Sequence, residues 1–293
     1  MKPARFAYFR PRNAHEAVRM IAAAGEDARF LAGGQSLVPM MNFRIARPGA
    51  LIDLSRCEDL TYIRRDRDVL RLGAMVRQRD AEMSDDVQSH CPLIAAALAL
   101  AGPATVRNQA TVGGTIANGY PVAQLPVVAV CLDAEMILIS AGGERSVSAN
   151  AFFMAGMVTD IAQGELLREL VFPVLGPRTR YSIVESGNHA GGAALAIVAA
   201  CGAIRAGGAW ENISLAAAGL CPVPRRLGAV EQAFVDGGTP AALKAAFRAD
   251  LQVIDEAGEA EEDDIGRRDL VWALIESALA RLNASQPASE FMA

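Results

Sequence analysis

Apolar residues recur with strand-like and helix-like spacing from the start of the chain. Residues 6–9 predict a strand, and residues 14–24 predict a helix that begins after Asn13, a favoured N-cap residue, and ends at Gly25. A second strand is predicted over residues 28–31. Strands and helices that alternate in this way are typical of α/β or α+β layers.

The same spacing continues to about residue 140. It predicts strands over residues 50–54, 61–64, 69–72 and 135–140 and helices over residues 76–83, 92–101 and 125–132. Two glycine-pair segments interrupt it. The first, residues 32–39, leads from a strand into a short helix. Ser36 could cap this helix, and its first turn accepts Pro39. The second segment, residues 110–118, is predicted to be a loop.

The pattern changes near residue 176, where two prolines and a glycine indicate a domain boundary. Strands are predicted over residues 181–185, 193–204 and 210–220, the last two joined by a hairpin through Gly207-Gly208. Helices are predicted over residues 225–234, 241–249 and 265–282, so we expect an antiparallel sheet covered by late helices. The acidic run at residues 259–264 is expected to be a solvated loop, and the tail from Ala284 to be frayed.

Composition indicates a soluble folded protein of two or more domains. The chain has 293 residues, of which 52% are hydrophobic and 21% charged, and its net charge of −5 with scattered arginines argues against nucleic-acid binding. The longest apolar stretch, residues 193–204, is too short to span a membrane, and the start lacks a signal sequence, so a cytoplasmic location is expected.

Cysteine and histidine usage argues against a metal centre and against histidine-based catalysis in this chain. The five cysteines lie far apart and without a C-x-x-C pair, so we interpret them as reduced, mostly buried thiols. None of the three histidines is in a paired spacing. No metal ligand and no catalytic residue is therefore assigned.

The two glycine pairs carry the chemical hypothesis. Gly33-Gly34 and Gly113-Gly114 could let consecutive N–H groups face an anion, with hydroxyls from Ser36, Thr111 and Thr115 beside them. Together the segments could clasp the pyrophosphate of a dinucleotide from two sides, although glycine pairs also end helices and form hairpins. The chain contains no Rossmann G-x-G-x-x-G after a strand, no phosphate-loop G-x-x-x-x-G-K-[ST] and no G-x-S-x-G elbow.

Both segments resemble a known family. AGGQSLVPMMNFR at residues 32–44 and RNQATVGGTIAN at residues 107–118 are similar to the two FAD loops of the medium, flavin-binding subunit of molybdenum hydroxylases, the carbon monoxide dehydrogenase and xanthine dehydrogenase family. The resemblance is good over residues 1–176. It is weaker from 181 to about 282, where PRRL at residues 224–227 and Glu231 carry it.

The resemblance implies a fold and a role. The fold would be α+β: a two-subdomain FAD-binding fold of the vanillyl-alcohol-oxidase-like (PCMH) type over residues 1–176, divided into about 1–57 and 58–176, then a smaller C-terminal α+β domain over 177–285 and a tail over 286–293. The role would be an FAD-containing electron-transfer subunit of a heterotrimeric molybdenum hydroxylase. It would take electrons from two [2Fe–2S] clusters of a small partner, beside a large molybdopterin subunit, and deliver them to an external acceptor. The assembly would be a dimer of heterotrimers.

By the same resemblance, residues of both segments would hold FAD. The residues carried over to the FAD site are Ala32, Gly33, Gly34, Gln35, Ser36, Leu37, Thr111, Val112, Gly113, Gly114, Thr115, Ala117, Asn118, Tyr120 and Gln124.

The chain departs from the family at polar positions. Tyr120 and Gln124 stand where the family often has acids, and Asn188-His189 and Gly192 appear where it has a basic pair and a later acid. These departures leave three alternatives: tolerated drift, a retuned flavin site, or a flavin-free or flavin-poor structural subunit of the same type of complex. A stand-alone flavin oxidase is a further alternative, but it would need its own substrate pocket and catalytic base.

Overall fold

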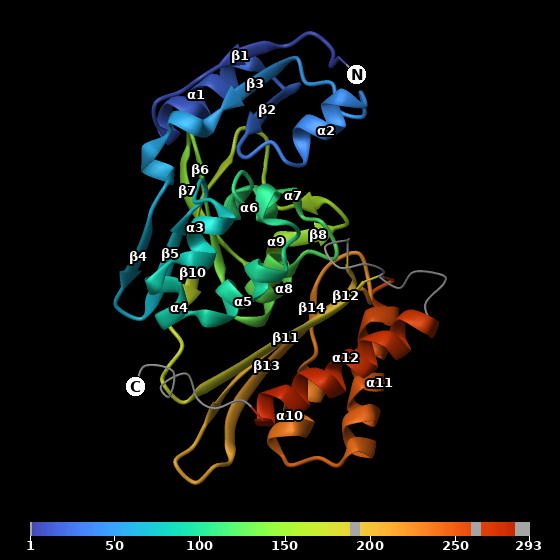
Figure 1. Ribbon diagram of the computed structural model, residues 1–293. Coiled ribbons are helices and arrows are strands. Elements are labelled where there is room, and N and C mark those ends of the chain that lie inside the picture. Colours follow the sequence, from blue (N-terminus) through green and yellow to red (C-terminus); the bar gives the residue numbers. More distant parts are fainter. Residues whose placement is uncertain (1, 188–193, 259–264, 285–293) are drawn as a thin grey trace.

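The computed structural model describes residues 2–187, 194–258 and 265–284. Three sheets follow one another along the chain and form three successive layers, each with its own helices (Figure 1). The predicted α+β class is confirmed. The departures at residues 188, 189 and 192, the acidic run and the tail beyond residue 284 lie outside the described residues.

The first layer is a three-stranded parallel sheet with one covering helix. It contains β1 (Ala7–Phe9), α1 (Ala14–Ala24), β2 (Ala28–Leu31), α2 (Leu37–Asn42) and β3 (Ala50–Asp53), and β3 lies between the other two strands. The predicted cap is confirmed, since the Asn13 side chain accepts a hydrogen bond from the Glu16 N–H at 2.8 Å. Short 3₁₀ turns at Leu54–Arg56 and Glu58–Leu60 lead to the next layer.

The second layer is a five-stranded antiparallel sheet whose central strand was not predicted. Its order is β4 (Ile63–Asp66), β5 (Val69–Gly73), β10 (Leu166–Pro173), β6 (Glu135–Ser140), β7 (Gly143–Ser148). In β10 the strand alternation is broken by a register shift between Leu167 and Glu169. Glu169 is buried because it accepts hydrogen bonds from Arg71 at 2.9 Å and Tyr62 at 2.7 Å, so a charged residue stands at an inward position.

Seven short helices and a small hairpin surround this sheet. They are α3 (Gln78–Met83), α4 (Asp85–His90), α5 (Pro92–Leu100), α6 (Ala104–Arg107), α7 (Val112–Asn118), α8 (Gln124–Cys131), α9 (Ala149–Phe152) and the hairpin of β8 (Phe153–Ala155) with β9 (Val158–Thr159). The prediction of a loop over residues 110–118 was wrong, because most of that segment is α7. The Thr111 hydroxyl caps this helix and makes it possible despite two glycines.

The third layer is the predicted antiparallel sheet with late helices. Its strands are β11 (Thr179–Gly187), β12 (Ala194–Ile204), β13 (Trp210–Ala218) and β14 (Arg225–Arg226), and its helices are α10 (Gly228–Val235), α11 (Pro240–Glu256) and α12 (Ile265–Ala284). The hairpin through Gly207-Gly208 is confirmed, with Gly208 at φ +86°. The helix expected from residue 225 begins at Gly228 instead, because Arg225–Arg226 pair with β13.

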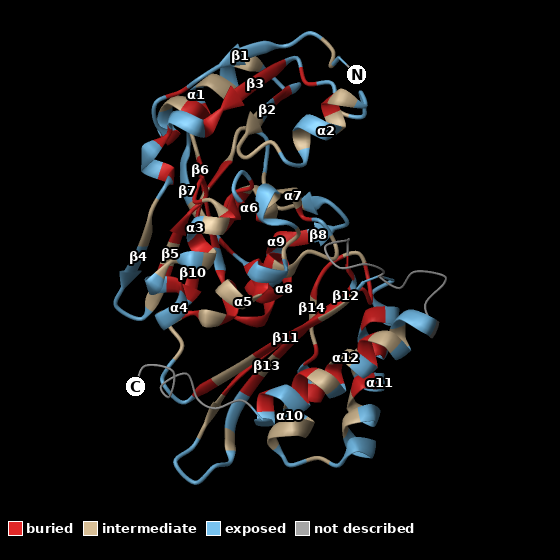
Figure 2. Cartoon of the chain, viewed as in Figure 1, coloured by how far each residue is buried: buried red, intermediate tan, exposed pale blue. Residues whose placement is uncertain are grey.

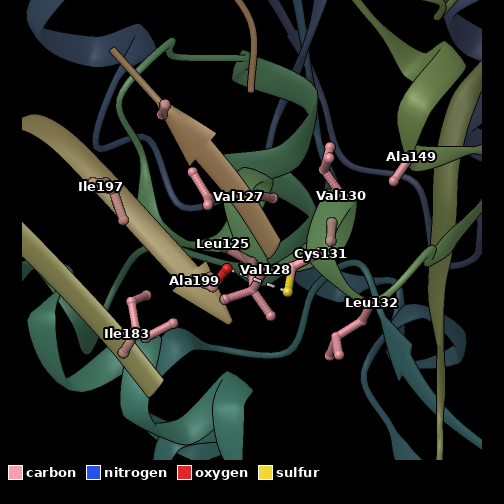
Figure 3. Close-up of a cluster of buried hydrophobic side chains, with 14 of the residues drawn as sticks. Leu125, Val127, Val128, Val130, Cys131, Leu132, Ala149, Ile183, Ile197 and Ala199 are labelled. Atoms are coloured by element: carbon pink, nitrogen blue, oxygen red, sulfur yellow. Dashed lines mark hydrogen bonds between the residues drawn. The ribbon is translucent and has the colours of Figure 1, made fainter. Parts of the chain in front are cut away.

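A single hydrophobic core joins the second and third layers. Helix α8 is buried on all sides from Leu125 to Cys131 and packs against α5 of the second layer and against β12 and β13 of the third (Figures 2 and 3). Figure 3 shows Cys131 against Ala199, whose carbonyl accepts a hydrogen bond from the thiol at 3.5 Å. A helix surrounded by apolar elements needs no polar face. The chain boundaries at 57 and 176 stay predictions, because this core continues across the second of them.

Candidate functional site

A cleft of about 440 Å³ lies between the first and second layers. The segment between β2 and α2, residues 32–36, forms one wall, and α7 with the loop before it forms the opposite wall (Figure 1). This volume is in the usual range for small-molecule sites. The cleft brings the two glycine segments together although they are some eighty residues apart in sequence.

The first glycine segment offers unused backbone donors. Gly34 has φ +72°, a left-handed conformation that glycine adopts without a steric penalty. Within the part of the chain that the structure describes, the N–H groups of Gly33, Gly34, Gln35 and Ser36 donate no hydrogen bond to another protein group. Gly33 and Gly34 are half-buried, whereas Gln35 and Ser36 are exposed to solvent. Half-buried N–H groups are usually paired, so the two unpaired ones in the lining of the cleft are suited to an anion or another acceptor. The predicted capping role of Ser36 was wrong, since its side chain makes no cap hydrogen bond to α2.

The second glycine segment has no such donors. The N–H groups of Val112 and Gly113 donate to the carbonyls of Val76 and Ala74 at 2.9 and 3.0 Å. Those of Gly114 and Thr115 donate to the Thr111 hydroxyl and carbonyl at 3.0 and 3.1 Å. The first turn of α7 is therefore satisfied internally.

Glycine is required in the second segment for close packing instead. A Cβ added to Gly113 would overlap the Ala74 side chain and lie 2.6 Å from its Cα. A Cβ on Gly114 would lie 2.8 Å from the Thr111 hydroxyl and 3.5 Å from Ala32 Cβ in the first segment. The glycine pair thus brings α7 against both the middle sheet and the opposite wall of the cleft.

The two walls touch at Gly33. A Cβ there would overlap the Gln109 carbonyl oxygen and lie 2.8 Å from Ala110 Cα. The segment that contains Gln109 is itself held by Arg107, whose guanidinium pairs with Glu82 at 2.8 Å while both side chains are about nine-tenths buried. Arg77 also donates to the Gln109 carbonyl.

Of the three hydroxyls singled out in the sequence, only that of Ser36 is unused. Thr111 is 1% exposed and caps α7. The Thr115 hydroxyl accepts from Gln78 Nε2 at 2.7 Å and donates to the Thr111 carbonyl at 3.2 Å. The polar surface that a ligand can reach is therefore concentrated on the first segment.

The structure brings most of the predicted site residues into this cleft. Those that line it are Ala32, Gly33, Gly34, Gln35, Ser36, Leu37, Thr111, Gly113, Gly114, Thr115, Ala117 and Asn118. Val112 is fully buried behind the wall. Tyr120 and Gln124 do not line the cleft. Tyr120 is 41% exposed, and Gln124 donates from Nε2 to Glu185 in β11 at 2.7 Å.

Sequence reasoning missed the rest of the lining. These residues are Arg29, Phe30, Met40, Leu54, Ala74, Met75, Ala110, Met157, Ile161, Glu165, Leu166 and Leu167. Arg29 and Phe30 directly precede the first segment, so their position in the chain was a usable signal. No local signal in the sequence marks Glu165, because its position depends on the distant Arg145. The Arg145 guanidinium donates hydrogen bonds to the Glu165 carboxylate at 2.7 Å and holds the pKa of that carboxyl below its usual range.

A further pocket of about 490 Å³ lies beside β10 and β12, but the described ranges hold no metal centre. No group of three or more His, Cys, Asp or Glu residues there could hold a metal ion, and no helix there is long and apolar enough to cross a membrane. All five cysteines are buried and none is in a disulfide. Burial raises the pKa of Cys57 and Cys201 to about 12, so these two thiols stay neutral.

Comparison with known proteins gives a consistent family. Residues 4–175 match the model of the FAD binding domain in molybdopterin dehydrogenase. The chain is 38% identical to the glyceraldehyde dehydrogenase medium chain of Sulfolobus acidocaldarius, over 79% of this chain and 82% of that protein. It is 31% identical to the carbon monoxide dehydrogenase medium chain of Hydrogenophaga pseudoflava, over 95% and 97%.

The fold agrees with the sequence match. A solved carbon monoxide dehydrogenase from Hydrogenophaga pseudoflava, in a form that lacks the Mo-pyranopterin moiety, contains a chain that superimposes with a TM-score of 0.90 at 32% identity, over 97% of this chain and 99% of that one. The two-subdomain FAD-binding fold expected from the resemblance is thereby confirmed. The chain belongs to the family of FAD-binding medium subunits of molybdenum-containing dehydrogenases, and FAD is its cofactor.

Proposed function

We propose that the first glycine segment holds the pyrophosphate of FAD and that α7 forms the opposite wall. The supporting observation is the run of four unpaired N–H groups from Gly33 to Ser36, which faces a cleft whose other wall lacks free backbone donors. The Ser36 hydroxyl adds a fifth donor, and the missing Cβ atoms of Gly33 and Gly34 allow a phosphate to approach the backbone. Asn118 offers a polar side chain on the other side.

We propose further that this chain transfers electrons and performs no chemistry of its own on an organic substrate. When bound, the flavin supplies reversible one- and two-electron chemistry. Among the described residues, no histidine lines the cleft, and the only lining carboxylate, Glu165, is held by Arg145 and the Ala162 N–H. A catalytic base must be free to take a proton, and this carboxylate is not.

The proposed complex is a heterotrimer, two copies of which form a dimer. A small partner with [2Fe–2S] clusters would deliver electrons to the flavin of this chain, a large molybdopterin partner would hydroxylate the substrate, and an external acceptor would receive the electrons. The relatives named above are medium chains, which supports partner subunits. A cytoplasmic location is part of the proposal, and five cysteines without a disulfide favour a reducing compartment.

Stoichiometry of the purified complex tests this role. The chain, co-expressed with its large and small partners, should contain one FAD per copy, with molybdenum and iron found only when the partners are present. Adding the substrate of the complex under anaerobic conditions should bleach the visible flavin absorption. A colourless chain in an otherwise intact complex would instead support a structural subunit, and a fully active isolated chain would support a stand-alone oxidase.

A further inference from the structure

Gln78 is a buried glutamine behind the second wall of the cleft. It is the first residue of α3, and only 5% of it is exposed. Its Nε2 donates a hydrogen bond to the Thr115 hydroxyl at 2.7 Å, but its Oε1 accepts none from the residues that the structure describes. A buried carbonyl oxygen without a donor lowers stability, and such groups are rare in folded proteins. The amide is therefore kept at a cost, which indicates a role other than packing.

The backbone, and not the amide, holds Gln78 in place. Its N–H donates to the Ala110 carbonyl at 2.9 Å, and the Val112 N–H donates to the Val76 carbonyl at 2.9 Å. These two hydrogen bonds join the start of α3 to the segment before α7 without any help from the Gln78 side chain. The amide is thus free to act on Thr115, which lines the cleft although Gln78 does not.

The Thr115 hydroxyl keeps its proton inside the protein. It donates to the Thr111 carbonyl at 3.2 Å while it accepts from Gln78. A hydroxyl has one proton and two lone pairs, so one lone pair is left for a ligand and no proton is left. Exchanging the oxygen and nitrogen of the Gln78 amide changes nothing here, because the hydroxyl would then donate to Oε1. Both amide orientations make Thr115 an acceptor toward the cleft.

The two walls of the cleft therefore offer opposite hydrogen-bonding groups. On the first wall, the unpaired N–H groups of Gly33 and Gly34 are donors, which suit phosphate oxygens. On the second wall, Thr115 is an acceptor, and an ionised phosphate has no proton to give it. A hydroxyl group of the ligand does have one. FAD carries such hydroxyls on both sides of its pyrophosphate, on the ribityl chain and on the ribose.

We propose that Gln78 is a positioning residue for FAD, which fixes the Thr115 hydroxyl as the acceptor for a hydroxyl group of the ribityl chain or the ribose. Gln78 does not touch the cofactor itself and acts only through Thr115. This inference rests on the proposed function, because it assumes that the cleft holds FAD. It adds a division of labour: the first glycine segment recognises the phosphates, and α7 recognises a sugar-like part of the cofactor.

Gln78→Met tests the role of the amide, because methionine keeps the length of the side chain and cannot hydrogen-bond to Thr115 in the same way. The affinity of the purified full chain for FAD should fall about tenfold. The free energy of unfolding of the FAD-free chain should not fall, because the variant also removes an unpaired buried carbonyl. Gln88→Met is the matched control, since Gln88 is an exposed glutamine of α4 that donates to the Glu82 carbonyl. It should bind FAD as the wild type does.

FAD analogues that each lack one hydroxyl of the ribityl chain or of the ribose identify the group that Thr115 accepts from. The wild type should bind one of them about tenfold more weakly than FAD. That ratio should shrink in Gln78→Met and disappear in Thr115→Val. A ribityl analogue would place Thr115 on the flavin side of the pyrophosphate, and a ribose analogue on the adenosine side. A merely structural role of Gln78 would not change a ratio between two ligands.

Two results would overturn the inference. The first is an analogue-to-FAD ratio that is the same in the wild type, Gln78→Met and Thr115→Val for every analogue. The second is a Gln78→Met chain that loses unfolding free energy and FAD affinity together while the ratio stays constant. Failure of the proposed function is distinguishable, because unchanged FAD affinity in Gly34→Ala would place the cofactor outside the cleft and remove both proposals. Weakened binding in Gly34→Ala with no effect of Gln78→Met would remove this inference alone.

Discussion

The two glycine pairs look alike in sequence but differ in structure. Gly33-Gly34 lies in irregular backbone with one left-handed residue and four unpaired N–H groups. Gly113-Gly114 lies in the first turn of a helix with every N–H from Val112 to Thr115 paired. The first pair lies beside unpaired donors and, at Gly33, also lets the two walls touch, whereas the second pair serves close packing alone.

A glycine pair therefore has at least two physical uses. Left-handed φ and free N–H groups make an anion site, whereas a missing Cβ at van der Waals distance makes a packing contact. Substitutions should therefore separate the two: changes in the first pair should mainly affect FAD affinity, and changes in the second should mainly affect folding stability.

The largest effect is expected at Gly33, where the two walls touch. Gly33→Ala places a Cβ on the Gln109 carbonyl, a backbone atom that cannot move away alone. We expect FAD affinity to fall at least 100-fold, about 2.7 kcal/mol, measured by titration of the purified chain with FAD. Gly207→Ala, with nothing within 4 Å of the added Cβ, is the control. Unchanged affinity would mean that the walls need not touch.

Gly113→Ala should act on stability first. The added Cβ would overlap Ala74 in the middle layer, and overpacking of this kind costs about 1–3 kcal/mol. We expect the free energy of unfolding of the FAD-free chain to fall by that amount, as measured by chemical denaturation followed by circular dichroism. If stability were unchanged while FAD affinity collapsed, α7 would contact the cofactor directly and the contrast between the pairs would fail.

Gly34→Ala should, in contrast, reduce FAD affinity. A Cβ at φ +72° costs about 1–2 kcal/mol and lies 3.1 Å from Val38, so the N–H groups must reorient. We expect roughly a tenfold loss of FAD affinity on this basis. Gly237→Ala is the matched control, because Gly237 has φ +74° with nothing within 4 Å and lies outside the cleft. Both variants should lose similar stability, but only the first should lose flavin.

The smallest effect concerns pH. Burial raises the pKa of Glu82, but hydrogen bonds from Arg107 and Arg79 outweigh this effect and hold the pKa below its ordinary value of 4.5. A carboxyl with a lowered folded pKa stabilises fully above its unfolded pKa and loses that contribution as pH falls through the folded value. Glu82→Gln should therefore flatten the loss of stability below about pH 4.5. An unchanged acid profile would show that Glu82 does not support the Gln109 segment.

The sequence predicted local features well where their causes are local. The Asn13 cap and the Gly207-Gly208 hairpin follow from neighbouring residues, whereas the pattern alone left α/β or α+β open and the resemblance to the family decided the class. Gly33 and Gly34 were assigned to one site with Gly113 and Gly114 by the pairing of the two segments and by the same resemblance.

Features that depend on distant partners could not be predicted. The β10 strand was missed because Glu169 breaks its apolar pattern, and Glu169 is tolerated only through Arg71 and Tyr62, about a hundred residues earlier. Gln124 was assigned to the cofactor, yet its amide bonds to Glu185, 61 residues later in the sequence. An acid at position 124 would repel Glu185, which gives this departure from the family a structural reason within this chain.

The central position of β10 also constrains the order in which the chain can fold during synthesis. Strands β5 and β6 both pair with it, and Leu166 and Ile139 complete the core beneath α1 in the first layer. A nascent chain that has not yet reached residue 173 therefore exposes unpaired edges on β5 and β6, which are prone to aggregate. Ribosomes that stall between residues 140 and 165 should release protein that needs chaperones and binds no flavin, whereas those that stall after residue 175 should release a first and a second layer able to close the cleft.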